Sequence, residues 1–310
     1  MATGRLGDTL TPLVHAGRLS EVATVLWSSG FGWLVDALGL GACVSLRCRL
    51  ACSTGLRSCP HHVDMDQPLP QRLVEVLGRL GPTYVKVGQL LATRTDYLPA
   101  AYADALRSLQ DDVPPFPTAR AREVVAAALG RPVEDVFVEF DAAPVAAASL
   151  SQVHRATLRG GTDVAVKVQR PGIQDRVEAD LALLGWLARR LERRRGATLA
   201  FRPTAAVREL AEYTRRELDF RNEARVAMAV ARALADDDGV VVPRVHWDLT
   251  TATVLTTDLA RGRRLAPRAE LEAAGLDADR LLQVGARAML RQIFDVGLFH
   301  ADPHPGNLLL

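Results

Sequence analysis

Apolar residues recur at helical spacing through the first 130 residues, which predicts a series of short helices. The segment from Val22 to Leu46 favours an amphipathic helix pair, and an irregular connector follows up to residue 65. The pairs Gly81-Pro82 and Pro114-Pro115 separate later segments, because such pairs end helices and favour turns. Further helices are therefore expected at 71–81, 83–99, 101–112 and 118–130.

The pattern changes to alternation at residues 136–172, where Val and Phe are frequent. This stretch predicts three antiparallel strands, with a loop after the first strand and a turn at Gly160-Gly161. The remaining elements are expected to be helices at Ile173–Arg195 and about Thr204–Ala235, a Val-rich hairpin turning at Thr250-Thr251, and a last helix at about Asp277–Val296.

This order of elements is that of a protein-kinase-like fold. A helical extension precedes a small sheet with inserted helices, and the start of a second helical region follows. The predicted fold class is α+β, with a complete N-lobe and only the start of a C-lobe. We expect four segments: a helical leader with its connector at 1–65, a helical extension at 66–130, the N-lobe at 131–258 and the start of the C-lobe at 259–310.

Composition and charge limit the function classes. Hydrophobic residues make up 48% of the chain and charged residues 24%, which is typical of a folded globular protein and excludes a disordered or fibrous one. The net charge of +2 argues against a nucleic-acid partner. One basic stretch, Ala188–Gly196, is interpreted as a solvated helix end or as a segment near anionic lipid headgroups.

The sequence predicts a cytoplasmic protein, with peripheral contact to a membrane as an extension of that prediction. It lacks the apolar core of a signal peptide and any run of eighteen apolar residues. Irregular spacing of the few cysteines favours a surface connector over a zinc site, and their absence elsewhere suits a reducing compartment. The residues concerned are Cys43, Cys48, Cys52 and Cys59, followed by His61 and His62.

A lysine on a predicted strand is the first candidate for chemistry. Lys167 ends the sequence VAVK, and its apolar neighbours give it a dry, fixed stem. In kinases such a lysine contacts the α- and β-phosphates of ATP. It needs an acidic partner on the next long helix, where Glu217, Asp219 and Glu223 are candidates. These acids lie among arginines, so the segment alone also fits a solvated charged surface.

The strongest motif is HADPHPGN, near the end of the chain. Asp302 and Asn307 have the spacing of Asp and Asn in the kinase loop H-R-D-x-x-x-x-N. Phosphoryl transfer needs a carboxylate facing the acceptor and an amide oxygen on the same loop for Mg²⁺. Pro303 and Pro305 stiffen the loop, and Gly306 permits a tight path. The motif predicts ATP and Mg²⁺ as cofactors.

A stretch rich in alanine stands where a kinase has its Gly-rich loop. Backbone N–H groups of such a stretch can still cradle phosphate. Methyl groups restrict the backbone, so the loop should be stiffer than a glycine loop. The residues are Ala146, Ala147, Ala148 and Ser149.

These motifs together resemble the UbiB/AarF-like atypical kinases, which include the mitochondrial coenzyme Q kinases. KVGQ at Lys86–Gln89 is similar to the K-x-G-Q signature of the family, and ELD at Glu217–Asp219 is similar to its E-x-D motif. The Ala-rich stretch, VAVKVQRPGI and HADPHPGN resemble its phosphate loop, lysine strand and catalytic loop. The resemblance runs from about residue 20 to the end, apart from the Cys-rich connector.

The resemblance implies a kinase or ATPase linked to ubiquinone or isoprenoid-lipid metabolism, with an isoprenoid lipid or a membrane surface as partner. Lys167 would contact nucleotide phosphates and pair with Glu223. Asp302 would be the catalytic carboxylate and Asn307 a Mg²⁺ ligand.

The resemblance also implies a regulatory contact and a nucleotide hinge. Lys86 and Gln89 would fold over the active site near Glu217 and Asp219, where a protein substrate would otherwise bind. The adenine hinge is expected at Thr257–Ala260, including Thr257, Asp258 and Ala260.

One departure from the family is the end of the sequence, which comes three residues after Asn307 and before an Asp-Phe-Gly segment. A second metal ligand is then absent, and the last helix would lack packing partners for its apolar side chains. We therefore expect a fragment that is not catalytically competent alone. The side chains concerned are Leu281, Leu282, Met289, Leu290, Ile293 and Phe294.

Two other functions stay open at this point. One is a non-catalytic, nucleotide-binding regulator. The other is a small-molecule phosphotransferase, which shares a His-x-Asp loop, although KVGQ and ELD argue against it.

Overall fold

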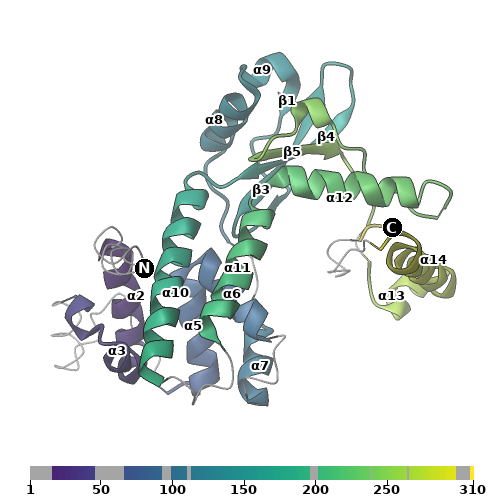
Figure 1. Cartoon of the computed structure of the whole chain (residues 1–310). Coiled ribbons are helices and arrows are strands. Elements are labelled where there is room, and N and C mark those ends of the chain that lie inside the picture. The colour runs from purple at the N-terminus through teal and green to yellow at the C-terminus, as the bar shows by residue number, and fades with distance from the viewer. Residues whose placement is uncertain are drawn as a thin grey trace. The chain divides into compact units, whose positions relative to one another are not determined.

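A computed structural model describes residues 16–45, 66–92, 99–109, 113–195, 202–237, 239–263, 265–297 and 308–310 (Figure 1). By its internal contacts the chain divides into two compact units. Unit 1 comprises Met1–Val113 and Gly172–Arg215, and unit 2 comprises Pro114–Pro171 and Arg216–Leu310. Each unit has its own hydrophobic core.

Unit 1 is helical in its described part. Its helices follow the predicted pattern with two differences at their ends. The helix expected over 83–99 is described only to Ala92, and residues 93–98 lie outside the described part of the chain. The helix expected over 101–112 ends at Leu106, and a turn follows. Its elements are α2 (Ala16–Ser28), α3 (Gly32–Ala37), the 3-10 turn η1 (Gly41–Cys43), α5 (Leu69–Leu80), α6 (Pro82–Ala92), α7 (Ala100–Leu106), α10 (Ile173–Arg195) and α11 (Pro203–Glu217), whose last two residues belong to unit 2.

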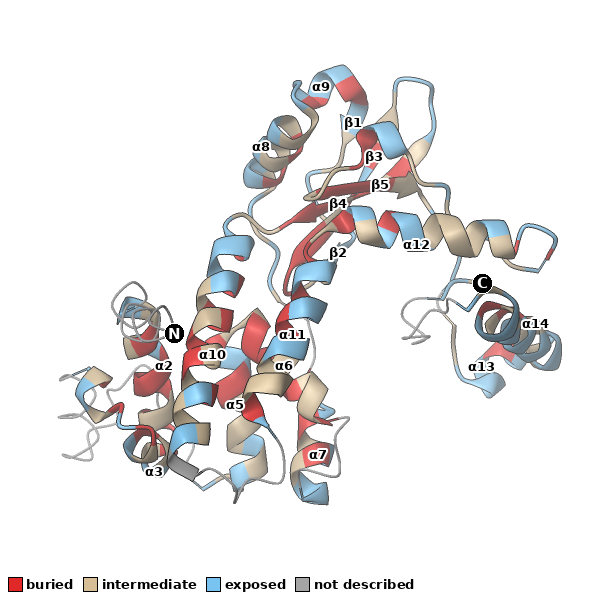
Figure 2. Cartoon of the chain, viewed as in Figure 1, coloured by how far each residue is buried: buried red, intermediate tan, exposed pale blue. Residues whose placement is uncertain are grey.

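The units do not follow the predicted segment boundaries. Helix α10 and most of α11 were expected as insertions in the N-lobe, but both belong to unit 1. The reason is apolar packing: Leu183 and Trp186 of α10 share a buried cluster with Val35 of α3 and Leu19 of α2. Figure 2 shows the buried faces of α2, α5 and α10 in red.

Unit 2 combines a sheet with helices, as the predicted α+β class requires. Its elements are α8 (Thr118–Leu129), α9 (Val133–Val136), β1 (Phe137–Phe140), β2 (Ala146–Ala147), β3 (Ser151–Leu158), β4 (Asp163–Gln169), α12 (Phe220–Ala233), the 3-10 turn η3 (Trp247–Leu249), β5 (Val254–Asp258), α13 (Arg268–Ala273), α14 (Ala278–Arg291) and the π-helical turn η4 (Gln292–Val296).

Within the described part of unit 2, five strands form one antiparallel sheet. The order is β1–β3–β4–β5, and β2 pairs with β3 on the same side as β1. Side chains alternate along β4, so its two faces differ. Val164, Val166 and Val168 are fully buried and share a core cluster with Val125 of α8. The opposite face carries Lys167, whose side chain contacts Glu223 and Phe220 of α12.

Two predicted elements of unit 2 differ from the structure. The helix expected over Thr204–Ala235 is broken at Leu218–Asp219, because Asp219 accepts a hydrogen bond from the Arg221 amide and begins a new helix, α12. The expected Val-rich hairpin has only one regular strand, β5. Its first half makes a single bridge, between Val245 and Thr257, and then turns into η3.

Helix α14 and η4 present apolar side chains to solvent. Leu282 is 69% exposed and Phe294 is 78% exposed, and Leu290 and Ile293 are also exposed. Leu281 and Met289 of the same predicted set are half-buried. None of the described helices combines the length and apolar character required to cross a membrane.

Candidate functional site

Lys167 and Glu223 form the centre of the candidate site. The Lys167 Nζ atom lies 2.7 Å from Glu223 Oε2 and 3.0 Å from Oε1. The ammonium group also lies 5.0 Å from the centre of the Phe220 ring, in the range of a cation–π contact. The Lys167 side chain is 30% exposed and that of Glu223 is 48% exposed, so a ligand can reach both charges.

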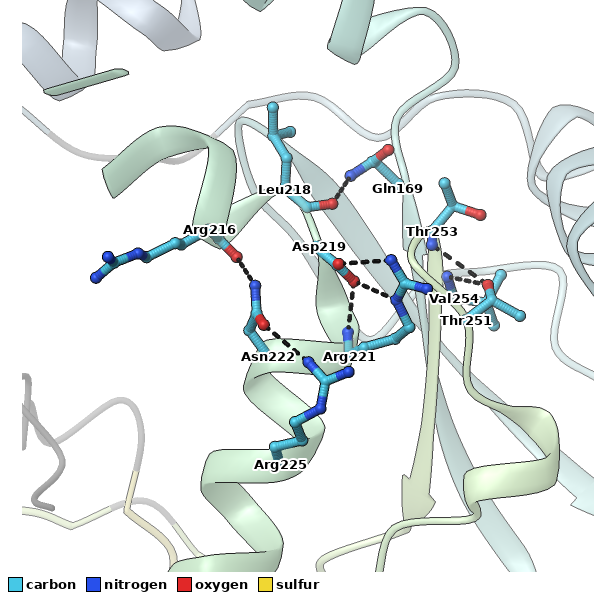
Figure 3. A network of polar contacts seen from close by, with 10 residues as sticks. All are labelled: Gln169, Arg216, Leu218, Asp219, Arg221, Asn222, Arg225, Thr251, Thr253 and Val254. Atoms are coloured by element: carbon cyan, nitrogen blue, oxygen red, sulfur yellow. Dashed lines mark hydrogen bonds and ion pairs between the residues drawn. The ribbon is translucent and has the colours of Figure 1, made fainter. Parts of the chain in front are cut away.

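This geometry separates the three acidic candidates of the sequence. Glu223 lies in the first turn of α12 and meets Lys167. Glu217 is the last residue of α11, and Asp219 caps α12. Figure 3 shows the Asp219 carboxylate paired with the Arg221 guanidinium, at 2.7 and 2.8 Å. This pairing is the main cause of a lowered pKa of the Asp219 carboxyl.

The start of α12 is fixed by hydrogen bonds from several directions. The buried Gln169 side chain donates to the Leu218 carbonyl at 2.8 Å (Figure 3). The Phe220 amide donates to the Ala252 carbonyl at 3.1 Å. Since Gln169 and Lys167 are two residues apart on β4, they reach the same helix from one face of the sheet. Gln169 was missed as a site residue, and its polar side chain beside a strand lysine was the available signal.

The Ala-rich stretch is less loop-like than predicted. Ala146 and Ala147 form β2 and pair with Gln152 and Val153 of β3, because the alanine methyl groups fit a sheet edge. The loop itself is therefore short. Its first residue, Ala148, donates its amide to the Ser151 carbonyl at 2.7 Å, and Ser149 is buried.

A buried polar network supports this part of the sheet. Gln152 and His154 are fully buried on β3, with Gln152 Nε2 lying 2.7 Å from His154 Nε2. The Gln152 Oε1 atom accepts from the Phe116 amide at 2.9 Å, and His154 Nδ1 lies 2.9 Å from the Asp141 carbonyl. Burial lowers the pKa of His154, which favours its neutral form. Neither Gln152 nor His154 is among the site residues predicted from the sequence.

The predicted hinge lies at the end of β5 and just beyond it. Thr257 pairs with β4 in the sheet. The amides of Asp258 and Leu259 donate to backbone carbonyls at 2.9 and 3.0 Å. The exposed Ala260 has no backbone partner for its amide in the described structure, and the expected contact of this segment with adenine stays a prediction.

The K-x-G-Q segment lies on α6 in unit 1. Gln89 donates to the Leu109 carbonyl at 3.4 Å, and Lys86 is half-buried. Gly88 is closely packed: a Cβ there would lie 2.3 Å from Leu109 Cδ1 and 2.8 Å from Leu77 Cδ1. The glycine of this motif is thus explained by packing. The expected contact of Lys86 and Gln89 with the E-x-D motif joins the two units, and it stays a prediction.

Several predicted residues lie outside the described part of the chain. They include Asp302 and Asn307 of HADPHPGN. Cys48, Cys52, Cys59, His61 and His62 do so as well, whereas Cys43 is described as a free thiol. Among the described residues, no group of three or more His, Cys, Asp or Glu side chains could hold a metal ion.

Comparison with known proteins supports a kinase-like identity. The family model described as the ABC1 atypical kinase-like domain matches residues 108–310. An uncharacterized protein of Synechocystis, sll1770, is 42% identical over 76% of this chain and 40% of its own length. The protein ACTIVITY OF BC1 COMPLEX KINASE 8, chloroplastic, of Arabidopsis thaliana is 42% identical over 77% of this chain and 32% of its own.

A solved structure shows a related fold. The complex of Rv3197 with erythromycin, from Mycobacterium tuberculosis, is 33% identical with a TM-score of 0.53, over 76% of this chain and 59% of that one. This chain therefore spans less than two thirds of the length of these relatives. Because the family model matches more than half of the residues, the chain belongs to the ABC1 atypical kinase-like family.

Proposed function

We propose that this chain binds ATP with Mg²⁺ and serves as the nucleotide-facing part of an atypical kinase or ATPase. The observation that carries the proposal is the ion pair between Lys167 of β4 and Glu223 of α12, on the face of the sheet that this helix covers. Two of the three N–H donors of Lys167 point to Glu223, so one remains for a phosphate oxygen. The residues present therefore fit a nucleotide phosphate.

The other roles follow from the family resemblance. Lys167 would hold the α- and β-phosphates, and Ala260 would donate to adenine. Asp302 would orient the acceptor, and the Asn307 amide oxygen would hold Mg²⁺. The metal ion, when bound, neutralises charge on the phosphates. Lys86 and Gln89 would restrict access of large acceptors.

A calorimetric titration of ATP with Mg²⁺ into the purified chain tests this function. Lys167→Met should weaken binding about 10- to 100-fold, since a hydrogen bond to a charged group is worth about 1.5–3 kcal/mol. Arg122→Met is a matched control, because Arg122 pairs with Glu134 away from this face. Equal affinity in the Lys167 and Arg122 variants would reject the assignment.

The acceptor chemistry is a further part of the proposal. The resemblance supports a role in ubiquinone or isoprenoid-lipid metabolism, at a cytoplasmic site that contacts a membrane surface peripherally. ATP turnover by a chain that continues through an Asp-Phe-Gly segment should then rise on vesicles that contain an isoprenoid quinone, and Asp302→Asn should abolish it. The 310-residue chain alone should bind ATP without turning it over. A non-catalytic regulator would instead gain thermal stability with nucleotide and show no turnover.

A second candidate function, macrolide binding, is favoured by one observation. The similar Mycobacterium tuberculosis protein is titled as a complex with erythromycin, and it is 33% identical to this chain. Titration of erythromycin into the chain, with and without ATP, tests this candidate. A change in one affinity caused by the other ligand would show that the two sites are coupled.

A further inference from the structure

Arg170 contacts both sides of the short Ala-rich loop. Its Nη2 atom donates to the Ala148 carbonyl at 3.2 Å, and its backbone amide donates to the Leu150 carbonyl at 2.8 Å. Ser149 lies between these two acceptors. A single residue thus holds the loop on both sides of its central position.

The same guanidinium is itself held in place. Arg170 Nη2 also donates to the Pro114 carbonyl at 3.1 Å, and Arg170 Cζ lies 5.2 Å from the centre of the Phe116 ring. Phe116 is fixed in turn by two backbone hydrogen bonds to the buried Gln152 side chain, at 2.9 and 3.2 Å. The guanidinium therefore joins the loop to a rigid part of the sheet, where a small displacement is not easily absorbed.

The loop leaves two donors for a ligand. The Ala148 amide is bonded to the Ser151 carbonyl. The amides of Ser149 and Leu150 have no hydrogen-bond partner within the described residues, although both residues are buried. A buried amide without a partner is costly, and a phosphate oxygen is a suitable acceptor for two adjacent amides.

We propose that Arg170 is a positioning residue, which holds the Ser149 and Leu150 amides in the orientation that receives a nucleotide phosphate. The inference rests on the proposed nucleotide site. Arg170 acts through the backbone of the loop. In this arrangement the loop is a fixed cradle, unlike a mobile glycine flap, because both of its ends are tied to the residue that follows β4.

The test compares Arg170→Met with Arg159→Met. Arg159 is a matched control, because its guanidinium also donates to two backbone carbonyls, at 2.8 and 3.0 Å, but at the β3–β4 turn. Affinities are measured for ATP, ADP and adenosine, together with the melting temperature. Arg170→Met should weaken ATP and ADP about tenfold and adenosine less than about twofold, since only the phosphates contact the loop. Arg170→Lys, which keeps a donor, should be intermediate.

Hydrogen exchange of the Ala148 amide supplies a readout that needs no nucleotide. Arg170→Met should speed this exchange on the order of tenfold, because the turn that the amide closes is released, and Arg159→Met should not. Proportional loss of all three ligands, or unchanged ligand affinities, would overturn the proposal. If the unaltered chain binds no nucleotide, the proposed function fails, and unchanged exchange in Arg170→Met would then reject the role of Arg170 as well.

Discussion

Two ion pairs, one in each unit, each join two elements of their unit, and they differ in burial. In unit 1, Arg18 of α2 meets Asp180 of α10 at 2.6 Å, and the side chains are 11% and 0% exposed. In unit 2, Lys167 meets Glu223 at 2.7 Å, with side chains that are 30% and 48% exposed. Similar distances therefore accompany very different access to solvent.

The donors of the two cations are used differently as well. Arg18 also donates to the second Asp180 oxygen at 3.0 Å and to the Leu80 carbonyl, and its Nη1 atom forms an ion pair with Glu21 Oε2 at 2.7 Å. Burial by itself lowers the pKa of Arg18, but the hydrogen bonds to Asp180 and Glu21 outweigh it, and the pKa is raised. Lys167 keeps a donor for a ligand. The buried pair is therefore suited to holding two helices together, whereas the exposed pair with a remaining donor is suited to binding a ligand.

The largest expected effect comes from breaking the buried pair. Asp180→Ala should lower the free energy of unfolding by about 3–5 kcal/mol, because the Arg18 charge stays buried without its partner. Urea unfolding followed by circular dichroism measures the loss. Glu178→Ala is the matched control on α10, since its pair with Arg215 is about half exposed, and it should cost at most about 1 kcal/mol. Equal losses in the two variants would remove the distinction by burial.

The Lys167–Glu223 pair is expected to depend on the hydrogen bond from the Gln169 side chain to the Leu218 carbonyl, which fixes the start of α12. Gln169→Leu leaves the buried Leu218 carbonyl without its donor, which should lower the free energy of unfolding by about 1–3 kcal/mol. Nucleotide affinity should fall with it, because α12 carries Glu223. Gln283→Leu on the exposed face of α14 should change stability by less than about 0.5 kcal/mol. Full nucleotide affinity in Gln169→Leu would show that the pair holds the helix without this anchor.

Local patterns in the sequence predicted the features that depend on neighbouring residues, such as helix bounds and strands. The bounds of α10 agree with the prediction at Ile173–Arg195, and α8 ends at Leu129 before Gly130 as expected. The alternation from residue 136 gave the strands, and Lys167 meets Glu223 as the family resemblance implied. These features depend on periodicity, turn residues and a motif, all of which lie within short stretches.

Short sequence patterns did not predict the contacts between residues that are far apart in the chain. Arg18 and Asp180 are 162 residues apart, and neither belongs to a motif. The hairpin prediction was wrong for its first half, because a Val-rich stretch specifies an extended chain but not the strand it pairs with. In the described part of that half, Val245 forms an isolated bridge with Thr257 of β5. Arg170 and Gln169 follow the lysine strand directly, yet their acceptors are backbone carbonyls, which leave no trace in the sequence.

Tight packing in the helical unit gives a smaller expected effect. Gly88→Ala should lower the free energy of unfolding by about 1 kcal/mol, since overpacking costs about 1–3 kcal/mol and the better helix propensity of alanine returns up to about 1 kcal/mol. Gly78→Ala on α5 is the matched control. Nothing lies within 4 Å of a Cβ at Gly78, so this variant should be slightly more stable. Stabilisation by both variants would contradict the close approach at Gly88.

The smallest expected effect concerns Asp219 at the start of the helix that carries Glu223. Its pKa is lowered chiefly by the Arg221 side chain, so the ionised form is favoured in the folded state. The resulting stability is fully present above the ordinary pKa of about 4 and is lost as the pH falls through the lower folded value. Because the Arg221 side chain is 49% exposed and that of Asp219 is 28% exposed, water screens the pair and the contribution should stay below about 1 kcal/mol. Asp219→Asn keeps an oxygen for the cap but cannot ionise.

Urea unfolding from pH 7 down to pH 3 measures the stability that ionised Asp219 contributes, as the difference in the free energy of unfolding between the unaltered chain and Asp219→Asn. The difference should shrink below about pH 4 and should also shrink in high salt, which screens exposed charges. Asp277→Asn is the matched cap of α14, because Asp277 likewise accepts from a backbone amide, that of Arg280. A pH-independent difference at Asp219 would mean that the cap alone, without the Arg221 pair, fixes the start of α12. The exposed Lys167–Glu223 pair would then owe its geometry to backbone hydrogen bonds and not to neighbouring charge.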